Sequence, residues 1–260
     1  MTTQIIKGLT VEIEGTGEAL LCIHGLGGSS NTWTPVLGAL EGFTIIRPDL
    51  PGSARSSSGA DKLSIEGYVE ALDQVLLELG VSTVHIAAHS LGTIVAQHFA
   101  VRFPEKVKSL ALFGPLVAPP EAARPNILAR AALARSGEPA MQEIADAIVK
   151  AATSKETKAD QPAVLALVRE NIMRQSPEGY AQSCEALAAA QPAAVEGIRV
   201  PVLLVTGDQD GVAPAANVTL MKERISNSRM VLLEGCGHWT TFEKPQACMQ
   251  ELQDFHASIR

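Results

Sequence analysis

A serine stands where an apolar run passes into a helical pattern, in the stretch "HIAAHSLGTIVAQHFA" from His85 to Ala100. A serine hydroxyl is a weak nucleophile at neutral pH unless a neighbouring base takes its proton. A sharp turn from a strand into a helix exposes such a serine and points the first helix amides at the reacting centre. The turn needs small residues two positions before and after the serine, and Ala88 and Gly92 flank Ser90 in this way. The pentapeptide alone fits a nucleophile and a helix-capping serine equally well.

Three distant segments supply the groups that a nucleophilic serine needs. The loop "HGLGG", residues 24–28, follows an apolar run, and its glycines let the backbone approach a ligand closely. The segment "TGDQDGVAP" carries two carboxylates, Asp208 and Asp210, and "GCGHW" places His238 among small residues. Taken singly, each has a structural explanation, such as a turn-capping aspartate or a packed histidine. Together they supply the base and the orienting carboxylate that nucleophilic catalysis requires. They follow in the order serine, aspartate, histidine, each directly after a predicted strand, which is hard to obtain by chance.

Apolar runs alternate with helical patterns along most of the chain. Helices are predicted from Ser64 to Leu79, with Gly80 as the stop, from Leu91 until Pro104 ends the pattern, and from about Pro245 onward. The predicted strands lie in "TVEIEG", "ALLCIHG", "FTIIRPDL", "TVHIAAHS", "KSLALFGPL", "VPVLLVTGDQD" and "RMVLLEGCGHW". This alternation predicts a mostly parallel sheet with helices on both faces. Sites in such folds lie beyond the carboxyl ends of the strands, where the residues above are found.

This set of motifs is similar to that of the α/β-hydrolase superfamily, over nearly the whole chain. The matching segments are "HGLGG" for the oxyanion loop, "PDLPGSARS" for the loop after the next strand, "AHSLG" for the nucleophile turn, "GDQDGVAP" for the acid loop and "GCGHW" for the histidine loop. The resemblance implies an α/β-hydrolase fold whose core consists of residues 1–116 and 198–260. Residues 117–197, rich in alanine and proline, are then a helical cap inserted after the strand that ends near residue 116. Such a cap excludes water and shapes the substrate pocket.

The resemblance also implies a role for each polar residue. Ser90 is then the nucleophile, His238 the general base, and Asp210 the carboxylate that orients His238 and stabilises its cation. Asp210 is preferred to Asp208 because the acid of this family usually lies three or four residues before a proline, here Pro214. Asp208 is then expected to cap a turn.

Backbone and aromatic groups complete the expected site. The resemblance implies that the amides of Leu26 and Leu91 form the oxyanion hole. Trp33 and Trp239 are large aromatic residues close to these motifs, and we expect them to line the substrate pocket.

The remaining histidines are expected to have structural roles. The resemblance implies that His24 braces its own loop and that the ring of His89 points into the core. Core or surface positions suffice for His85, His98 and His256. No histidines have zinc-site spacing, and "HGLGG" lacks the G-x-G-x-x-G fingerprint of dinucleotide sites, so neither a metal nor a cofactor is predicted.

The residues around the serine reduce the number of reaction classes to consider. Superfamily members with an acidic nucleophile, the dehalogenases and epoxide hydrolases, are disfavoured by the serine. C–C bond hydrolases typically carry "G-N-S-x-G", and His89 occupies the asparagine position. Ala88 and Thr93 also stand where glycines are commonest, although alanine is small enough for the turn. The chain is similar to small bacterial esterases of the 3-oxoadipate enol-lactonase and pimeloyl-carrier methylesterase type.

We therefore expect hydrolysis of a small-molecule carboxylic ester or lactone through an acyl-enzyme. Two alternatives remain open at this point. One is a C–C bond hydrolase or lyase-type reaction on the same three residues, and the other is a non-catalytic receptor that binds a ligand in the cleft.

The composition indicates which binding partners and which cellular compartment to expect. The 260 residues are 46% hydrophobic with a net charge of −7 and no basic cluster, so nucleic acid is not an expected partner. No run of 18 apolar residues predicts a membrane span, and the opening residues do not resemble a signal peptide. The four cysteines are widely spaced without a C-x-x-C pair, which favours a reducing, cytoplasmic setting. Monomer and homodimer both remain open.

Overall fold

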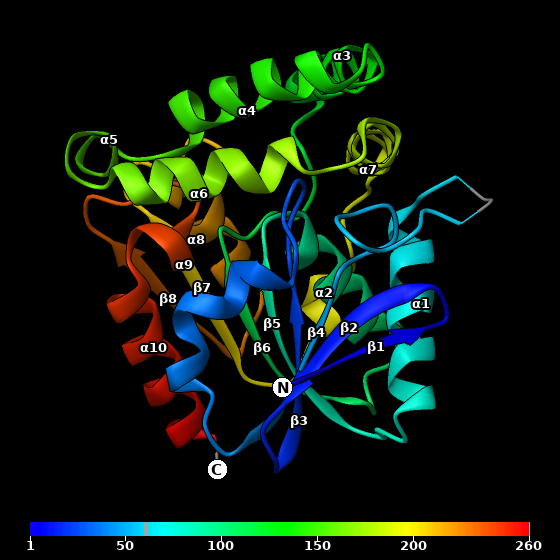
Figure 1. Cartoon of the computed structure of the whole chain (residues 1–260). Coiled ribbons are helices and arrows are strands. Elements are labelled where there is room, and N and C mark those ends of the chain that lie inside the picture. Colours follow the sequence, from blue (N-terminus) through cyan, green and yellow to red (C-terminus); the bar gives the residue numbers. More distant parts are fainter. Residues whose placement is uncertain (60–61, 260) are drawn as a thin grey trace.

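The computed structural model describes residues 1–59 and 62–259. In that part of the chain, eight strands form one sheet in the order β1-β2-β4-β3-β5-β6-β7-β8 (Figure 1). The strands are β1 (Thr2–Ile6), β2 (Leu9–Glu14), β3 (Glu18–Ile23), β4 (Phe43–Pro48), β5 (Val84–His89), β6 (Val107–Phe113), β7 (Val202–Gly207) and β8 (Ser228–Leu233). In this order, every pair of neighbouring strands from β4 through β3 to β8 is parallel. The pair β1 and β2 and the pair β2 and β4 are antiparallel. The mostly parallel sheet predicted from the sequence is confirmed.

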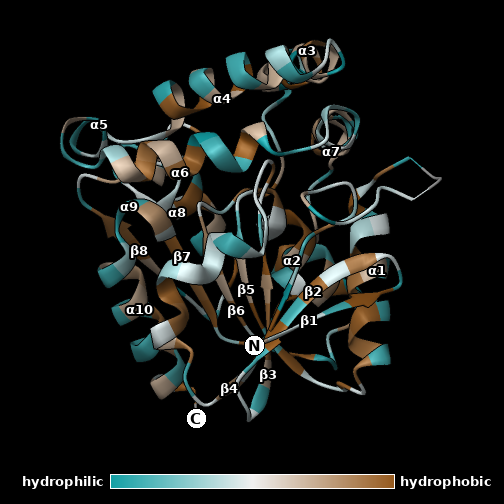
Figure 2. Cartoon of the chain, in the orientation of Figure 1, coloured by the Kyte–Doolittle hydropathy of each residue, from teal (hydrophilic) through white to brown (hydrophobic). Residues whose placement is uncertain are grey.

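Helices cover both faces of this sheet. One face carries α1 (Ile65–Glu78), α2 (Leu91–Arg102) and α8 (Ala215–Arg224), and the other carries the 3-10 helix η1 (Ser30–Ala39) and α10 (Pro245–Ser258). Successive strand residues point to opposite faces, so the strands from β3 to β8 contribute to two separate hydrophobic clusters, one on each face. Figure 2 shows the apolar residues concentrated along the strands and on the inward sides of the helices.

The order of the strands explains why the site forms where it does. The chain runs from β3 to β4 on one side and then crosses to β5 on the other side of β3. Such a reversal leaves a crevice outside the carboxyl ends of the strands on either side of the switch. Ile23 at the end of β3 pairs with Ala88 near the end of β5, so the "HGLGG" loop and Ser90 emerge side by side.

Local sequence signals place most of the helix ends. Ser64 precedes α1 and its side chain accepts a hydrogen bond of 3.0 Å from the amide of Gly67, as the predicted cap requires. The helix predicted from Leu91 ends at Arg102, and the last helix begins at Pro245. Strand β1 and the 3-10 helix η1 were not predicted from the sequence. Strand β1 is an exposed edge strand without a buried face, so it lacks the alternation that identifies strands.

The segment between β6 and β7 is helical throughout. Its elements are η2 (Glu121–Ala123), α3 (Arg124–Ala134), α4 (Glu138–Ala152), α5 (Lys155–Asp160), α6 (Pro162–Met173), α7 (Pro177–Ala189) and η3 (Val195–Gly197). Every residue from 117 to 197 is described, and none of them is in a strand. Helix α3 packs against α7, and α4 packs against α6. Figure 1 shows α3 to α7 lying across the carboxyl edge of the sheet, and we refer to residues 117–197 as the cap segment.

Two loops at this edge approach each other closely at Gly207, the last residue of β7. A Cβ atom added to Gly207 would lie 2.1 Å from the carbonyl oxygen of Cys236 and 2.6 Å from that of Gly237. Only glycine therefore allows the loop after β7 to lie against the loop after β8. This close packing brings Asp210 and His238 to the same place.

Gly207→Ala should destabilise the protein by about 1–3 kcal/mol, because the added methyl group must push two backbones apart. The matched control is Gly211→Ala in the same loop, where an added Cβ meets nothing within 4 Å. That variant should stay within about 0.5 kcal/mol of the parent. Urea unfolding of the three proteins measures the difference, and equal stabilities for the two variants would contradict the packing argument.

Candidate active site

Ser90 occupies the sharp turn between β5 and α2. Its backbone has φ 53° and ψ −122°, in the left-handed half of the map that non-glycine residues rarely adopt. Such strain persists only where the surroundings enforce it, and it is found most often at functional sites. A Cβ added at Gly92 would lie 2.5 Å from the carbonyl oxygen of His24, so the turn packs directly on the neighbouring loop. The Ser90 hydroxyl makes no capping hydrogen bond to α2, which removes the helix-cap explanation.

The structure brings Ser90, His238 and Asp210 into one hydrogen-bonded chain. The Nε2 atom of His238 lies 2.8 Å from the Oγ of Ser90, and its Nδ1 lies 2.8 Å from Oδ2 of Asp210. All three side chains are buried. A carboxylate only accepts hydrogen bonds, so Nδ1 carries the proton and Nε2 is left to accept from the serine hydroxyl. Histidine in this tautomer is ready to take the serine proton.

Hydrogen bonds keep the Asp210 carboxyl ionised in this buried position. Its Oδ1 accepts bonds of 2.8 Å from the amides of both Val212 and Ala213. Burial raises the pKa of Asp210, but the contact with His238 and the two amides outweigh burial and lower the pKa to about 2. The carboxylate is therefore negative at neutral pH.

The second carboxylate in this loop faces elsewhere. Oδ1 of Asp208 accepts a hydrogen bond of 3.0 Å from the amide of Cys236, and this bond ties the loop after β7 to the loop after β8. Of the two aspartates that the sequence offers, Asp210 is the one that contacts His238.

The two histidines beside the site tie backbone segments together. Nδ1–H of His24 donates to the carbonyl of Gly25 (2.8 Å), and Nε2 accepts from the amide of Leu50 (2.9 Å). Nε2–H of His89 donates to the carbonyl oxygen of His238 (2.8 Å). Burial lowers the pKa of His24, and burial together with the nearby His238 lowers the pKa of His89 to about 3. Both rings are therefore neutral and structural, and His89 holds the backbone that carries His238.

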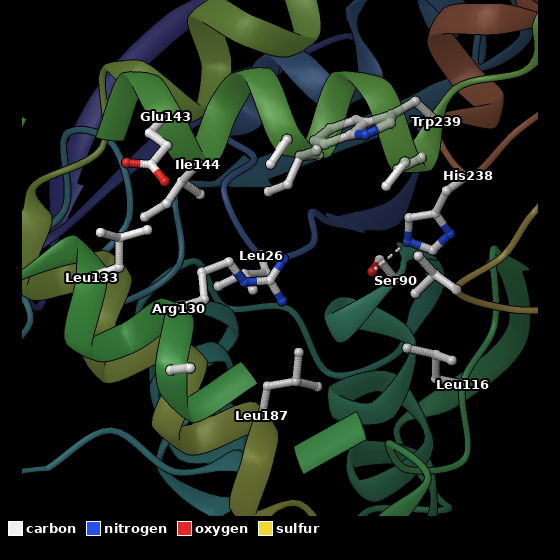
Figure 3. Close-up of a pocket in the computed structure, with 16 residues that line it drawn as sticks. Leu26, Ser90, Leu116, Arg130, Leu133, Glu143, Ile144, Leu187, His238 and Trp239 are labelled. Carbon is white, nitrogen blue, oxygen red and sulfur yellow. Dashed lines mark hydrogen bonds between the residues drawn. The ribbon is translucent and has the colours of Figure 1, made fainter. Parts of the chain in front are cut away.

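A cavity of about 430 Å³ opens above Ser90 and His238 (Figure 3). Its remaining walls are mainly apolar and come from the core and from the cap segment. The other lining residues are Leu26, Leu116, Ala129, Arg130, Leu133, Glu143, Ile144, Ala147, Ile148, Ala151, Ala152, Leu187, Val212 and Trp239. Such a space accepts a small organic molecule next to the serine.

The two tryptophans differ in position. Trp239 lines the cavity, next to His238 in the sequence. Trp33 does not, and the expectation that it lines the pocket is wrong. It is fully buried on η1, on the face of the sheet that α10 covers, with its ring 5.7 Å from that of Phe113 in an edge-to-face contact. Proximity in sequence to the "HGLGG" loop does not reveal on which side of the sheet η1 packs.

The cap residues that line the cavity were not predicted from the sequence either. Arg130 comes from α3, Ile144 from α4 and Leu187 from α7. The alanine-rich pattern predicts helices here, but nothing in it identifies the helix faces that meet the core.

A buried carboxylate fixes the loop that carries His238. Oε2 of Glu243, a residue only 2% exposed, accepts bonds from the amide of Gly237 (3.0 Å), the amide of Ser154 (2.8 Å) and the hydroxyl of Thr157 (2.8 Å). Its Oε1 accepts a bond from the amide of Trp239 (3.1 Å). One side chain therefore binds the residues on both sides of His238 and the start of α5.

The backbone of His238 reinforces this connection. Its amide donates a hydrogen bond of 2.9 Å to the carbonyl oxygen of Ala152, the last residue of α4. The histidine loop and the junction between α4 and α5 are consequently held together by several hydrogen bonds. No motif identified Glu243 in advance, because its four donors come from segments far apart in the chain.

Glu243→Gln should lower the free energy of unfolding by about 1–3 kcal/mol, because an amide cannot accept from all four donors and leaves buried groups unpaired. Glu234→Gln is the matched control, since Glu234 is exposed in the same loop. We expect that change to stay within about 0.5 kcal/mol. Chemical denaturation of both variants measures the contrast, and a Glu243→Gln protein as stable as its control would contradict the inferred role.

Other kinds of site are not evident in the described part of the chain. It holds no group of three or more His, Cys, Asp or Glu side chains that could bind a metal ion. All four cysteines are buried free thiols. None of the helices in residues 1–59 and 62–259 is long and apolar enough to cross a membrane.

Comparison with known proteins identifies the family to which this fold belongs. Residues 18–245 match the alpha/beta hydrolase fold family, and the chain belongs to that family. An uncharacterized protein of Mycobacterium tuberculosis is 28% identical over 263 residues, which cover 94% of this chain and 76% of that protein.

Two solved structures share the fold over almost the whole chain. An esterase from Thermogutta terrifontis, solved with malate bound, superposes with a TM-score of 0.90 at 23% identity, over 99% of this chain and 98% of the esterase. The enol-lactonase from Burkholderia xenovorans LB400 gives a TM-score of 0.88 at 24% identity, over 98% and 100% of the two chains.

Proposed function

We propose that this protein is a serine hydrolase that cleaves a carboxylic ester or lactone of a small molecule. The observation that carries the proposal is the continuous chain of hydrogen bonds from Ser90 through His238 to Asp210 at the edge of an apolar cavity. An esterase and an enol-lactonase share the fold, which agrees with this reaction class. The reaction itself is inferred from the three side chains.

Each side chain has a definite part in the proposed reaction. His238 takes the proton of Ser90 as Oγ attacks the carbonyl carbon, and it then gives that proton to the leaving alkoxide. The acyl group is now bound to Ser90. His238 next removes a proton from a water molecule that attacks the acyl carbon, and it returns the proton to the serine. Asp210 remains negative and stabilises the histidine cation in both halves of the reaction.

We assign the binding of the negative oxygen that develops to two backbone amides, those of Leu26 and Leu91. Leu26 lines the cavity with Ser90, and a Cβ added to the preceding Gly25 would lie 2.7 Å from Cβ of Ser90, so this backbone lies against the serine. Leu91 is the first residue of α2, where amides have no partner within the helix and the helix dipole favours negative charge.

The cap segment has a separate role in this proposal. We assign residues 1–116 and 198–260 to a core domain that carries the catalytic groups, and residues 117–197 to a cap domain. The cavity above Ser90 is closed by residues of α3, α4 and α7. Walls of this kind exclude bulk water and select the substrate by shape.

Replacement of the nucleophile tests the proposal. Wild-type protein should hydrolyse p-nitrophenyl butyrate and form a covalent adduct with a fluorophosphonate, located on Ser90 by peptide mass spectrometry. Ser90→Ala should lose the adduct and lower kcat by at least about 10³-fold, because no other group can attack from the turn. Full ester hydrolysis by Ser90→Ala would refute the proposal.

The two aspartates provide a matched pair of variants. Asp210→Asn should lower kcat by about 10³–10⁴-fold, since an amide in that position favours the wrong histidine tautomer. Asp208→Asn should remain within a few-fold of wild type, because Asp208 makes no contact with the His238 ring and an amide oxygen can still accept from the amide of Cys236. The pKa of Asp210, about 2, also means that protonation of this carboxylate does not cause an activity loss at mildly acid pH. A large kcat loss confined to Asp208→Asn would reverse the assignment.

A further inference from the structure

One cationic side chain stands in the otherwise apolar part of the cavity. Arg130 belongs to α3 and lines the same cavity as Ser90 and His238. Figure 3 shows its side chain extending from α3 toward the interior of the cavity, while Ser90 and His238 lie together at another side. The surrounding walls are contributed mainly by leucine, isoleucine and alanine side chains.

The guanidinium of Arg130 has no carboxylate partner among the described residues, although the Cys184 side chain is within hydrogen-bonding reach of it. Its Nε atom is buried without a hydrogen-bond partner in the described part of the chain. No carboxylate of residues 1–59 and 62–259 forms an ion pair with it, whereas Arg135, just beyond the same helix, pairs with both Glu178 and Glu185. A buried donor without a partner costs free energy, and the cost is larger for a charged group.

The polar groups near Arg130 do not neutralise it. Tyr180 and Cys184 on α7 lie close enough for the guanidinium to act on their titration, but burial raises the pKa of Cys184 to about 11 and raises that of Tyr180 still further. Both are therefore neutral at pH 7. Glu143 on α4 also lines the cavity, but its side chain is exposed and forms no ion pair with Arg130 among the described residues.

We propose that Arg130 binds a carboxylate of the substrate, so that the enzyme acts on an ester or lactone that carries a free carboxylate. This inference rests on the proposed function, because it needs the scissile bond at Ser90. The planar guanidinium can form two parallel hydrogen bonds to a carboxylate, which supplies both the missing partner and the missing negative charge. Apolar walls between Arg130 and Ser90 suit a methylene chain that links the two groups.

A second cavity refines the choice of substrate. It measures about 390 Å³ and shares Leu116, Arg130, Leu187 and Val212 with the first, so Arg130 stands where the two meet. Because Arg130 borders both cavities, the best length of the chain between the ester and the free carboxylate has to be found by experiment. Probes should span mono-p-nitrophenyl esters of dicarboxylic acids from succinate to suberate.

The test compares each of these esters with a neutral one of the same length, in which a methyl ester blocks the free carboxylate. Wild-type protein should prefer the charged ester of the best length. Arg130→Gln should lower kcat/KM for that ester by about tenfold or more, mainly through KM, and change the neutral ester by less than about twofold. Arg130→Lys should recover part of the loss. The matched control, Arg135→Gln, removes an arginine that is already paired and should alter neither substrate.

Glu143→Gln gives an independent check. Removal of a negative charge from the same cavity should raise kcat/KM for the charged ester while the neutral ester is unaffected. A decrease for the charged ester in this variant, an equal loss for both esters in Arg130→Gln, or a wild-type preference for the neutral ester would each overturn carboxylate binding by Arg130.

Failure of the proposed function would look different. In that case neither ester would be hydrolysed and no fluorophosphonate adduct would form on Ser90. Calorimetry with free glutarate then measures directly whether Arg130 binds a carboxylate. Binding by wild type that Arg130→Gln abolishes, and Arg135→Gln preserves, would support the carboxylate site, and absence of binding by wild type would overturn it.

Discussion

The site depends on how closely three backbones can approach one another at the carboxyl edge of the sheet. Ser90 holds a strained φ of 53° because β5 must turn into α2 within one residue. The loop after β3 can lie against that turn because Gly25 and Gly92 carry no side chain. The same constraint recurs at Gly207, where the acid loop contacts the histidine loop. Larger residues at these positions would separate the groups whose hydrogen bonds define the site.

The cap segment and the core share responsibility for the position of His238. His89 holds its carbonyl oxygen from the core side, while Ala152 accepts its amide hydrogen from the end of α4. Glu243 joins the two sides through four hydrogen bonds. A movement of the α4–α5 junction would therefore be transmitted to His238, so that the segment that encloses the cavity also supports the hydrogen-bonded chain of Ser90, His238 and Asp210.

Charged side chains at this edge fall into two groups. Asp210 and Glu243 are surrounded by donors that their own fold supplies, which offsets the cost of burying a carboxylate. Arg130 differs, because its Nε has no partner in the described structure although it faces the cavity. A charged group whose hydrogen-bond partners all come from the fold has the role of holding the site together. A charged group that faces a cavity without such partners is suited to bind a ligand.

The fold class and the candidates Ser90, Asp210 and His238 could be predicted from the amino-acid sequence, because parallel strands deliver the residues after their ends to one edge. The helix that begins after Ser64 could be predicted as well, since capping is a local interaction. Three-dimensional packing was needed to learn that Trp239 and not Trp33 faces the cavity, that Glu243 binds the loop of His238, and that Arg130 lines the cavity. Periodicity shows that a helix has an apolar face. What that face meets depends on how the cap segment packs on the core, and this packing is set by contacts between residues far apart in the chain.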